Sequence, residues 1–382
     1  MTENKTFNSR FIVWMVILLA GLGLGIWGVV TTFLSGLQTW GIGDEVPWGI
    51  VTASYVFFVA ASAGCITVSL GHALGIKGFD LIIKRGVFLA IITMIAGGLL
   101  IVMHVGNPVN LWRLITAPNF GSPLGWLVIF YLLYLILLII DFYLIHKKDF
   151  VKARIFGILA PLSAITVHST LGSVFGFASV RHYYGGAFAP VYFIVIAVVI
   201  GTALLLFVTN LHYKFNSKSM SSEMRSVIVS LGKFLGIAIG VLAIFVIWKN
   251  LTGLSNPDPS TVKAYQYMLA GPGAWWYWIL AIGLGLLAPL ILIINRNTRT
   301  PNGIMLASGL SIIGMLAARF DFTIGGQVIP IFEDLQHIQQ PWADYAATFT
   351  EVSIVVLAFS LTALLYTWGS RKLALEEVAE HV

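Results

Sequence analysis

The sequence predicts an all-α integral membrane protein with about ten transmembrane helices. Apolar residues make up 58% of the 382 residues and charged residues only 10%, a composition far from that of a soluble domain. Ten apolar stretches of about 18 to 26 residues are long enough, at 1.5 Å per residue, to cross a hydrocarbon core of about 30 Å. Because backbone polar groups need internal partners in lipid, such stretches form helices. They are 11–33, 49–74, 86–106, 124–145, 155–177, 188–211, 227–248, 275–294, 303–320 and 349–369.

The basic residues alternate between the connections and predict the topology. Of the 22 Lys and Arg residues, 17 lie in or near the N-terminal tail, the even-numbered connections and the C-terminal tail. The positive-inside rule therefore places both termini of this multi-pass protein in the cytoplasm. The longer, outer connections are rich in Gly, Pro, Trp and Tyr. The five basic residues assigned to the outer side are Arg113, Arg181, Lys249, Lys263 and Arg319.

Composition also excludes several kinds of site and partner. The single cysteine, Cys65, rules out a disulfide framework, a Cys-ligated iron–sulfur cluster and a CxxCH haem site within this chain. The net charge of +6 comes from basic residues at membrane edges, where they set orientation. We therefore expect membrane lipid, and no nucleic acid, around this protein.

A repeated turn pattern predicts two parallel four-helix bundles with one flanking helix at each end. Gly106-Asn107-Pro108 resembles Ser255-Asn256-Pro257, with an offset of about 150 residues. An even number of spans in each repeat keeps the two units parallel. The expected parts are an N-terminal tail, first helix and outer loop (1–47), a first bundle that holds the candidate site (48–187), a second bundle with an outer loop (188–348), and a last helix with its tail (349–382).

Polar residues inside the spans of the first unit mark the candidate site, because polar groups in a membrane are costly and tend to be functional. The corresponding positions of the second unit are apolar. Thr52, Tyr55, His104 and His168 lie at depths that predict one narrow pocket opening to the outer face. The residues expected at the rim of this pocket or in the loop above it are Asn107, Trp112, Arg113, Arg181, His182 and Tyr183.

Such a pocket suits a quinone, which has an apolar tail and two oxygens. Quinol oxidation releases two protons and two electrons, and a histidine with a pKa of about 6.5 can accept one of the protons. A tyrosine hydroxyl can donate to the other oxygen. We therefore expect His104 or His168 to be catalytic, so that His104→Ala or His168→Ala lowers quinol-linked turnover while assembly is kept. Asp141 is expected to pair with the basic loop after it, with an inner proton path as the alternative.

Two segments resemble the NrfD-like family, which includes the quinone-binding membrane subunits of polysulfide reductases. The first is the run VPWGIVTASY at 46–55 with Ala61-Ser62-Ala63-Gly64, whose small residues also predict close helix packing. The second is His168-Ser169 with the run RHYYGG at 181–186 and Pro190. Related subunits occur in some hydrogenases, sulfite-reduction-associated complexes and alternative complex III. The resemblance covers nearly the whole chain.

The resemblance implies a quinone, menaquinone or a similar one, bound near the outer face as substrate. It also implies a partner on the external side, an iron–sulfur subunit with several clusters, and further catalytic or cytochrome subunits of a respiratory complex. The membrane subunit itself is expected to carry no haem or iron–sulfur cluster. In polysulfide reductases, Asn and His occupy the positions that match Thr52 and Tyr55. This sequence departs there, so its proton acceptor has to come from elsewhere.

Three other functions stay open on the sequence alone. A secondary transporter suits duplicated bundles, although such folds usually contain broken helices or charges at mid-membrane. A b-type cytochrome needs paired axial ligands, whereas His104 and His168 differ in depth by about 11 Å at helical rise. A structural anchor for an external enzyme predicts no quinone binding.

Overall fold

The computed structural model describes residues 9–106, 108–178, 181–330 and 342–376, without the side chain of His182. Within these residues, ten helices are long and apolar enough to cross a membrane and no strand is present, so the predicted fold class is confirmed. The elements are α1 (Ser9–Ser35), η1 (Leu37–Thr39), α2 (Ile50–Cys65), α3 (Thr67–Ala73), η2 (Phe79–Leu81), α4 (Ile83–His104), η3 (Pro108–Asn110), α5 (Arg113–Thr116), α6 (Pro123–His146), α7 (Phe150–Gly176), η4 (His182–Tyr184), α8 (Phe188–Phe215), α9 (Ser222–Leu254), α10 (Pro259–Leu269), η5 (Trp276–Leu287), α11 (Ala288–Ile294), α12 (Pro301–Gly325) and α13 (Phe349–Lys372).

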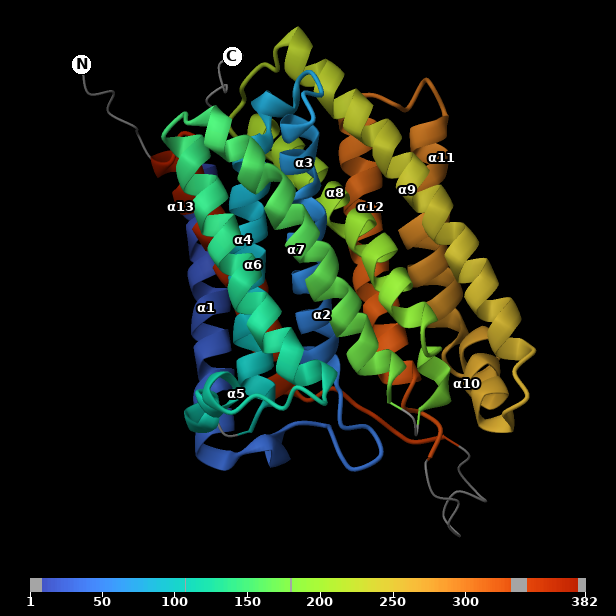
Figure 1. Cartoon of the computed structure of the whole chain (residues 1–382). Helices are drawn as coiled ribbons and strands as arrows, with labels where there is room; N and C mark the ends of the chain where they lie inside the picture. Colours follow the sequence, from blue (N-terminus) through green and yellow to red (C-terminus); the bar gives the residue numbers. More distant parts are fainter. Residues whose placement is uncertain (1–8, 107, 179–180, 331–341, 377–382) are drawn as a thin grey trace.

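The helices form two groups around one central span. Helices α2 and α3 together make that span, which is almost wholly buried, and α4, α6 and α7 complete the first bundle. The second bundle consists of α8, α9, the η5–α11 span and α12, and its α8 and α12 pack against α2. Helices α1 and α13, from the two ends of the protein, lie side by side (Figure 1). Trp14 Nε1 donates to Thr367 Oγ1 at 3.0 Å, so these two helices run antiparallel.

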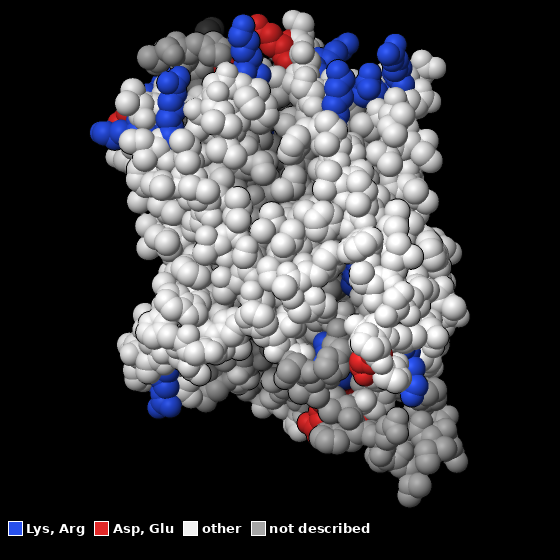
Figure 2. All heavy atoms as spheres, turned by 45° about the vertical axis from the view of Figure 1, so that its right-hand side comes forward, with Lys and Arg blue, Asp and Glu red and all other residues white. Residues whose placement is uncertain are grey.

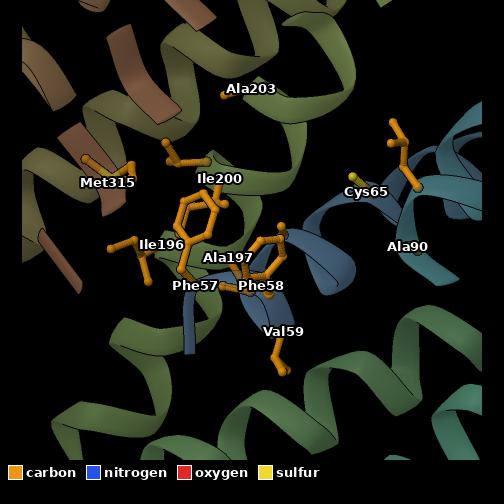
Figure 3. Packing of buried hydrophobic residues seen from close by; sticks show 14 of the residues in the cluster. Phe57, Phe58, Val59, Cys65, Ala90, Ile196, Ala197, Ile200, Ala203 and Met315 are labelled. Carbon is orange, nitrogen blue, oxygen red and sulfur yellow. The ribbon is translucent and has the colours of Figure 1, made fainter. Parts of the chain in front are cut away.

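The two bundles meet most closely where α2 crosses α8. A Cβ added to Gly201 would lie 2.2 Å from the backbone of Gly64 and Cys65, and one added to Gly64 would lie 2.0 Å from the carbonyl oxygen of Ala197. Only glycine fits such a contact between two backbones, as is common in membrane proteins. Figure 3 shows the side chains that pack around this crossing, with Phe57 and Phe58 of α2 beside the α8 residues. The close packing predicted for the small residues of α2 is confirmed at Gly64.

The structure corrects the predicted position of two charges. Helix α9 continues to Leu254 and α12 to Gly325, several residues beyond the apolar stretches. Lys249, assigned to an outer connection, and Arg319, assigned to the outer end of its predicted span, lie within helices and are 8% and 0% exposed. The second bundle therefore also contains buried charges, at positions other than those compared with the polar positions of the first. On the face drawn in Figure 2, most Lys and Arg side chains nevertheless gather at one end, beside a broad uncharged belt.

Candidate functional site

Helix α2 carries a stripe of polar residues toward α4 and α6. In the first turn of α2, Thr52 Oγ1 lies 3.3 Å from His104 Nδ1 at the end of α4. The tautomer of the imidazole decides which atom donates. The indole of Trp40 lies over the same imidazole, with 6.1 Å between ring centroids. The structure therefore brings together two of the residues predicted for the site, and it adds Trp40.

One turn deeper, the Tyr55 hydroxyl forms a short hydrogen bond with the Tyr131 hydroxyl of α6. Further along the same face, Ser62 Oγ donates to the carbonyl oxygen of Ala90 at 2.7 Å and lies 3.1 Å from the Tyr134 hydroxyl. Along α2, Tyr55 follows Thr52 by three residues and Ser62 follows Tyr55 by seven, so the three side chains share one face of the helix. Tyr131 was not predicted, since nothing in its apolar surroundings on α6 distinguishes it from a lipid-facing aromatic residue.

A carboxylate that was not predicted stands beside His104. Glu351 is buried in the first turn of α13, where it accepts hydrogen bonds from the backbone N–H of Gly41 (2.8 Å) and from the Tyr345 hydroxyl (2.8 Å). Its carboxylate lies close enough to His104 to interact with it electrostatically. The signal was present in the sequence, because Thr348 and Glu351 have the spacing of a capping box before an apolar run.

Tyr345 connects this carboxylate to the start of α2. Its hydroxyl accepts the backbone N–H of Ile50 at 2.8 Å while donating to Glu351. Burial raises the pKa of Tyr345 above its usual value, so the hydroxyl keeps the proton that this bond needs. The first turn of α2, and with it Thr52, is thereby fixed relative to α13.

His168 lies apart from this group, at the junction with the second bundle. Two residues on the same face of α7 contact that bundle: Gly172 lies against Pro190 of α8, and Phe175 packs on Phe322 of α12. The His168 ring is fully buried near the carbonyl of Ala164, without a well-formed hydrogen bond. The charge of Arg319 acts on it. Among the residues that the structure describes, no hydrogen bond joins His168 to Thr52, Tyr55 or His104.

Arg181 holds three backbone carbonyls together at the end of the spans where α2 begins. Its guanidinium donates to Gln327 (2.9 Å), Ile329 (2.6 Å) and Glu45 (2.5 Å). The Gln327 side chain in turn accepts from the backbone N–H of Trp48 and donates to its carbonyl oxygen. Arg181 thus joins the segment before α2 to the segment after α12, and its contacts give it a structural role.

The remaining predicted residues are separated from one another. Tyr183 lies against the second bundle, where its hydroxyl accepts from Lys249 Nζ at 2.8 Å. Burial raises the pKa of Tyr183 well above its usual value. Trp112 is exposed on the outer side, with Arg113 over its ring at 5.6 Å. Asn107 and the side chain of His182 lie outside the described residues. The described residues expected in one pocket lie in two groups, one around Thr52 and His104 and the other around Tyr183.

The group around α2 has the means to bind a ligand with two oxygens and to move a proton. His104 offers an imidazole that can accept a proton, and the Glu351 carboxylate lies close enough to interact with it. The Tyr55 and Tyr131 hydroxyls offer a donor one turn away, about 4.5 Å along the helix axis. No group of three or more His, Cys, Asp or Glu side chains able to hold a metal ion occurs among the described residues.

Comparison with known proteins places this arrangement in a family. The chain is 27% identical over 392 residues to the Hdr-like menaquinol oxidoreductase integral membrane subunit of Archaeoglobus fulgidus, an alignment that includes 98% of this chain and 97% of that protein. It is 25% identical to a selenate reductase subunit of Mesobacillus selenatarsenatis, over 90% and 91% of the two proteins. It is 26% identical to a polysulfide reductase chain of Wolinella succinogenes, over 76% and 98%. The family described as "Polysulphide reductase, NrfD" matches residues 40–331, most of the sequence, and this protein therefore belongs to the NrfD family.

Proposed function

We propose that this protein is the quinone-binding membrane subunit of a respiratory oxidoreductase. In this proposal it exchanges electrons between the membrane quinone pool and an iron–sulfur protein on the outer side. Two relatives carry menaquinol or menaquinone in their names, the Archaeoglobus fulgidus subunit and the menaquinone reductase integral membrane subunit of Nitratidesulfovibrio vulgaris. Relatives named as parts of selenate and polysulfide reductases support a multisubunit complex.

The observation that carries the proposal is the pairing of Thr52 with His104 one turn from the pairing of Tyr55 with Tyr131. The two oxygens of a quinone ring have a separation comparable to one helical turn, so each oxygen can meet one pair. A quinol hydroxyl gives its proton to His104, and the nearby charge of Glu351 stabilises the imidazolium that forms. The second hydroxyl forms a hydrogen bond with the tyrosine pair, and its proton also leaves through His104 after the imidazolium has released the first proton to the outer side. Two electrons leave to the external partner for each quinol that is oxidised.

The position of this group near the outer ends of α2 and α4 fits release of protons to the outer side. The proposed orientation places both termini in the cytoplasm of a prokaryotic cell, as the distribution of Lys and Arg predicts. An iron–sulfur partner then docks on the outer side, above His104. His104 is the last residue of its helix. A quinol bound there would therefore be close to the outer surface, and its electrons would travel only a short distance to the iron–sulfur partner.

The proposal is tested by quinol-linked turnover of the intact complex with His104→Gln and Thr52→Val. Glutamine keeps a polar side chain but cannot accept a proton, so loss of the base should lower turnover by about 100-fold or more. Valine keeps the shape of Thr52 and removes one hydrogen bond of about 1 kcal/mol, so a drop of roughly fivefold is expected. His146→Gln, at the opposite end of the membrane-spanning region, is the matched control. Wild-type turnover in assembled His104→Gln complex contradicts the proposal.

A further inference from the structure

A cavity of about 440 Å³ lies at the outer end of the second bundle, between the start of α8, the end of α9 and α10. Its volume is in the range of small-molecule sites. Thr52, Tyr55 and His104 do not line it, so it is separate from the group around α2. The residues that define its chemistry are Tyr183, Tyr184, Trp248, Lys249, Asn256 and Tyr265.

The Lys249 ammonium is held at the cavity wall by aromatic rings. Its Nζ lies 4.3 Å from the ring centroid of Tyr183, 4.8 Å from Phe322, 5.6 Å from Tyr265 and 5.8 Å from Tyr192. Rings at these distances attract a cation, most strongly where water is excluded. The four rings come from η4, α12, α10 and α8, so the second bundle and the outer segments together fix the position of the charge.

Two residues of the cavity wall, Lys249 and Asn256, have N–H groups that donate no hydrogen bond to the described residues. An ammonium has three N–H groups, and the bond to Tyr183 at 2.8 Å uses one of them. The Asn256 Oδ1 atom accepts from the backbone N–H of Asp258 at 2.9 Å. Its Nδ2 group donates no hydrogen bond to the described residues. The hydroxyls of Thr252 and Thr261 are already donated, to Trp248 and Asp258.

The charges around the cavity are balanced, which favours a neutral ligand. Asp321 on α12 attracts Lys249, and the two form no direct ion pair within the described residues. Arg319 adds a positive charge and Asp258, at the start of α10, a negative one. An anion finds no excess of positive charge among these groups. A neutral molecule with oxygen acceptors needs only the free N–H groups.

The cavity has an open side and an approach from lipid. Gly186 lines it with a φ of 52°, and a Cβ added there would meet no atom within 4 Å. Trp248 and Leu251 of α9 are 60% and 55% exposed, on a helix that crosses the membrane. An apolar tail can therefore leave the cavity beside α9, while a flat ring lies among the tyrosines.

We propose that this cavity binds a second quinone molecule, whose carbonyl oxygens accept hydrogen bonds from Lys249 and Asn256. The chemistry of the walls selects this class of ligand: a neutral, flat ring with oxygen acceptors and an apolar tail. The proposal goes beyond the site around α2 and is independent of it. The protein then has two quinone sites, one in each bundle.

The test is the number of quinones bound by the full-length protein in lipid nanodiscs, titrated with dimethylnaphthoquinone, which has no free ring position to react with thiols. The wild type should bind two per protein. Lys249→Met keeps an unbranched apolar stem among the rings and removes the ammonium, so one site should weaken at least tenfold. Asn256→Ala should weaken the same site, and His104→Gln the other. Lys152→Met, at an exposed position of the opposite end, is the control.

Each outcome separates the two sites. If the wild type binds two quinones and Lys249→Met and His104→Gln each bind one, both sites are supported. One bound quinone that is lost in His104→Gln refutes the second site and leaves the first. Unchanged binding of two quinones by Lys249→Met and Asn256→Ala also refutes it. If Lys249→Met fails to fold because Asp321 is left without its cation, Lys249→Met/Asp321→Asn restores the charge balance and gives the same test.

Discussion

Replacing Gly201 by alanine should separate the two bundles at their closest contact. The added Cβ would lie 2.2 Å from the backbone N of Cys65 and the carbonyl C of Gly64, where ordinary contact begins at 3.4 Å. The helices α2 and α8 must therefore move apart by about 1.2 Å, which is 3.4 minus 2.2. Both opposing atoms belong to backbone, so no side chain can rotate to relieve the clash.

The expected cost is set by two opposing effects. Overpacking of this kind costs about 1–3 kcal/mol, while alanine in a helix gains about 0.5–1 kcal/mol over glycine. Gly201→Ala should therefore lower stability by about 1–2 kcal/mol. Gly240 in α9 is the matched control, because an added Cβ there meets no atom within 4 Å, so Gly240→Ala should be neutral or stabilising.

The assay is the temperature at which half of the monodisperse protein is lost on heating in detergent, read by size-exclusion chromatography. At about 2–4 °C per kcal/mol, and toward the lower end for a protein of this size, the two variants should differ by several degrees. Equal melting temperatures for Gly201→Ala and Gly240→Ala refute the reasoning. They would mean that α2 and α8 absorb the methyl group without cost.

Three further changes test other contacts. Arg181→Lys cannot reach all three carbonyls, so it should cost about 2 kcal/mol and speed proteolysis of the outer loops. Asp141→Asn keeps an acceptor for the Ser69 hydroxyl, now at 2.5 Å, whereas Asp141→Ala should cost a further 1–3 kcal/mol or so in thermal unfolding; equal values contradict this. Burial raises the pKa of Glu376, but Lys218 and other nearby cations lower it more, giving a net decrease. The contact of Glu376 with Lys218 should therefore be complete above the usual Glu pKa of about 4.3 and be lost as the pH falls below that value and through the lowered pKa of Glu376. A spin label beside Glu376 would report the loss; unchanged mobility of the label in acid contradicts this.

The spans were predictable because hydropathy and length decide membrane insertion. All ten apolar stretches correspond to membrane-length helices in the structure. The end of α9 was not predictable, because the charge of Lys249 is typical of a loop. The full burial of Arg319, which lies within its predicted span, was not predictable either. Arg319 sits over the Phe193 ring at 4.3 Å and Lys249 among four rings. These rings, which stabilise the buried charges, belong to other helices. The local sequence around Lys249 or Arg319 therefore does not reveal them.

The sequence predicted how deep the residues of the candidate site lie along their helices, but not which neighbouring helix each side chain faces. Thr52 and His104 lie at similar heights by helical rise, and the structure joins them. Asp141 was expected to pair with basic residues after its helix, yet its carboxylate accepts from Ser69 of α3. The direction in which each helix faces its neighbours depends on packing between helices. A single sequence carries little of that information.

The separation of His104 from His168 follows from the position of α2. This helix lies between α4 and α8, so a residue of α4 and a residue at the α7–α8 junction meet opposite sides of it. The crossing at Gly64 is about 21 Å below the start of α2 at helical rise, and nearer the outer face the bundles are joined by aromatic side chains such as Trp48, Phe175 and Tyr184. A displacement at the crossing must be taken up by these aromatic contacts, and Tyr184 among them also lines the cavity of the second bundle. Gly201→Ala should therefore weaken quinone binding in both bundles, whereas His104→Gln and Lys249→Met each affect one.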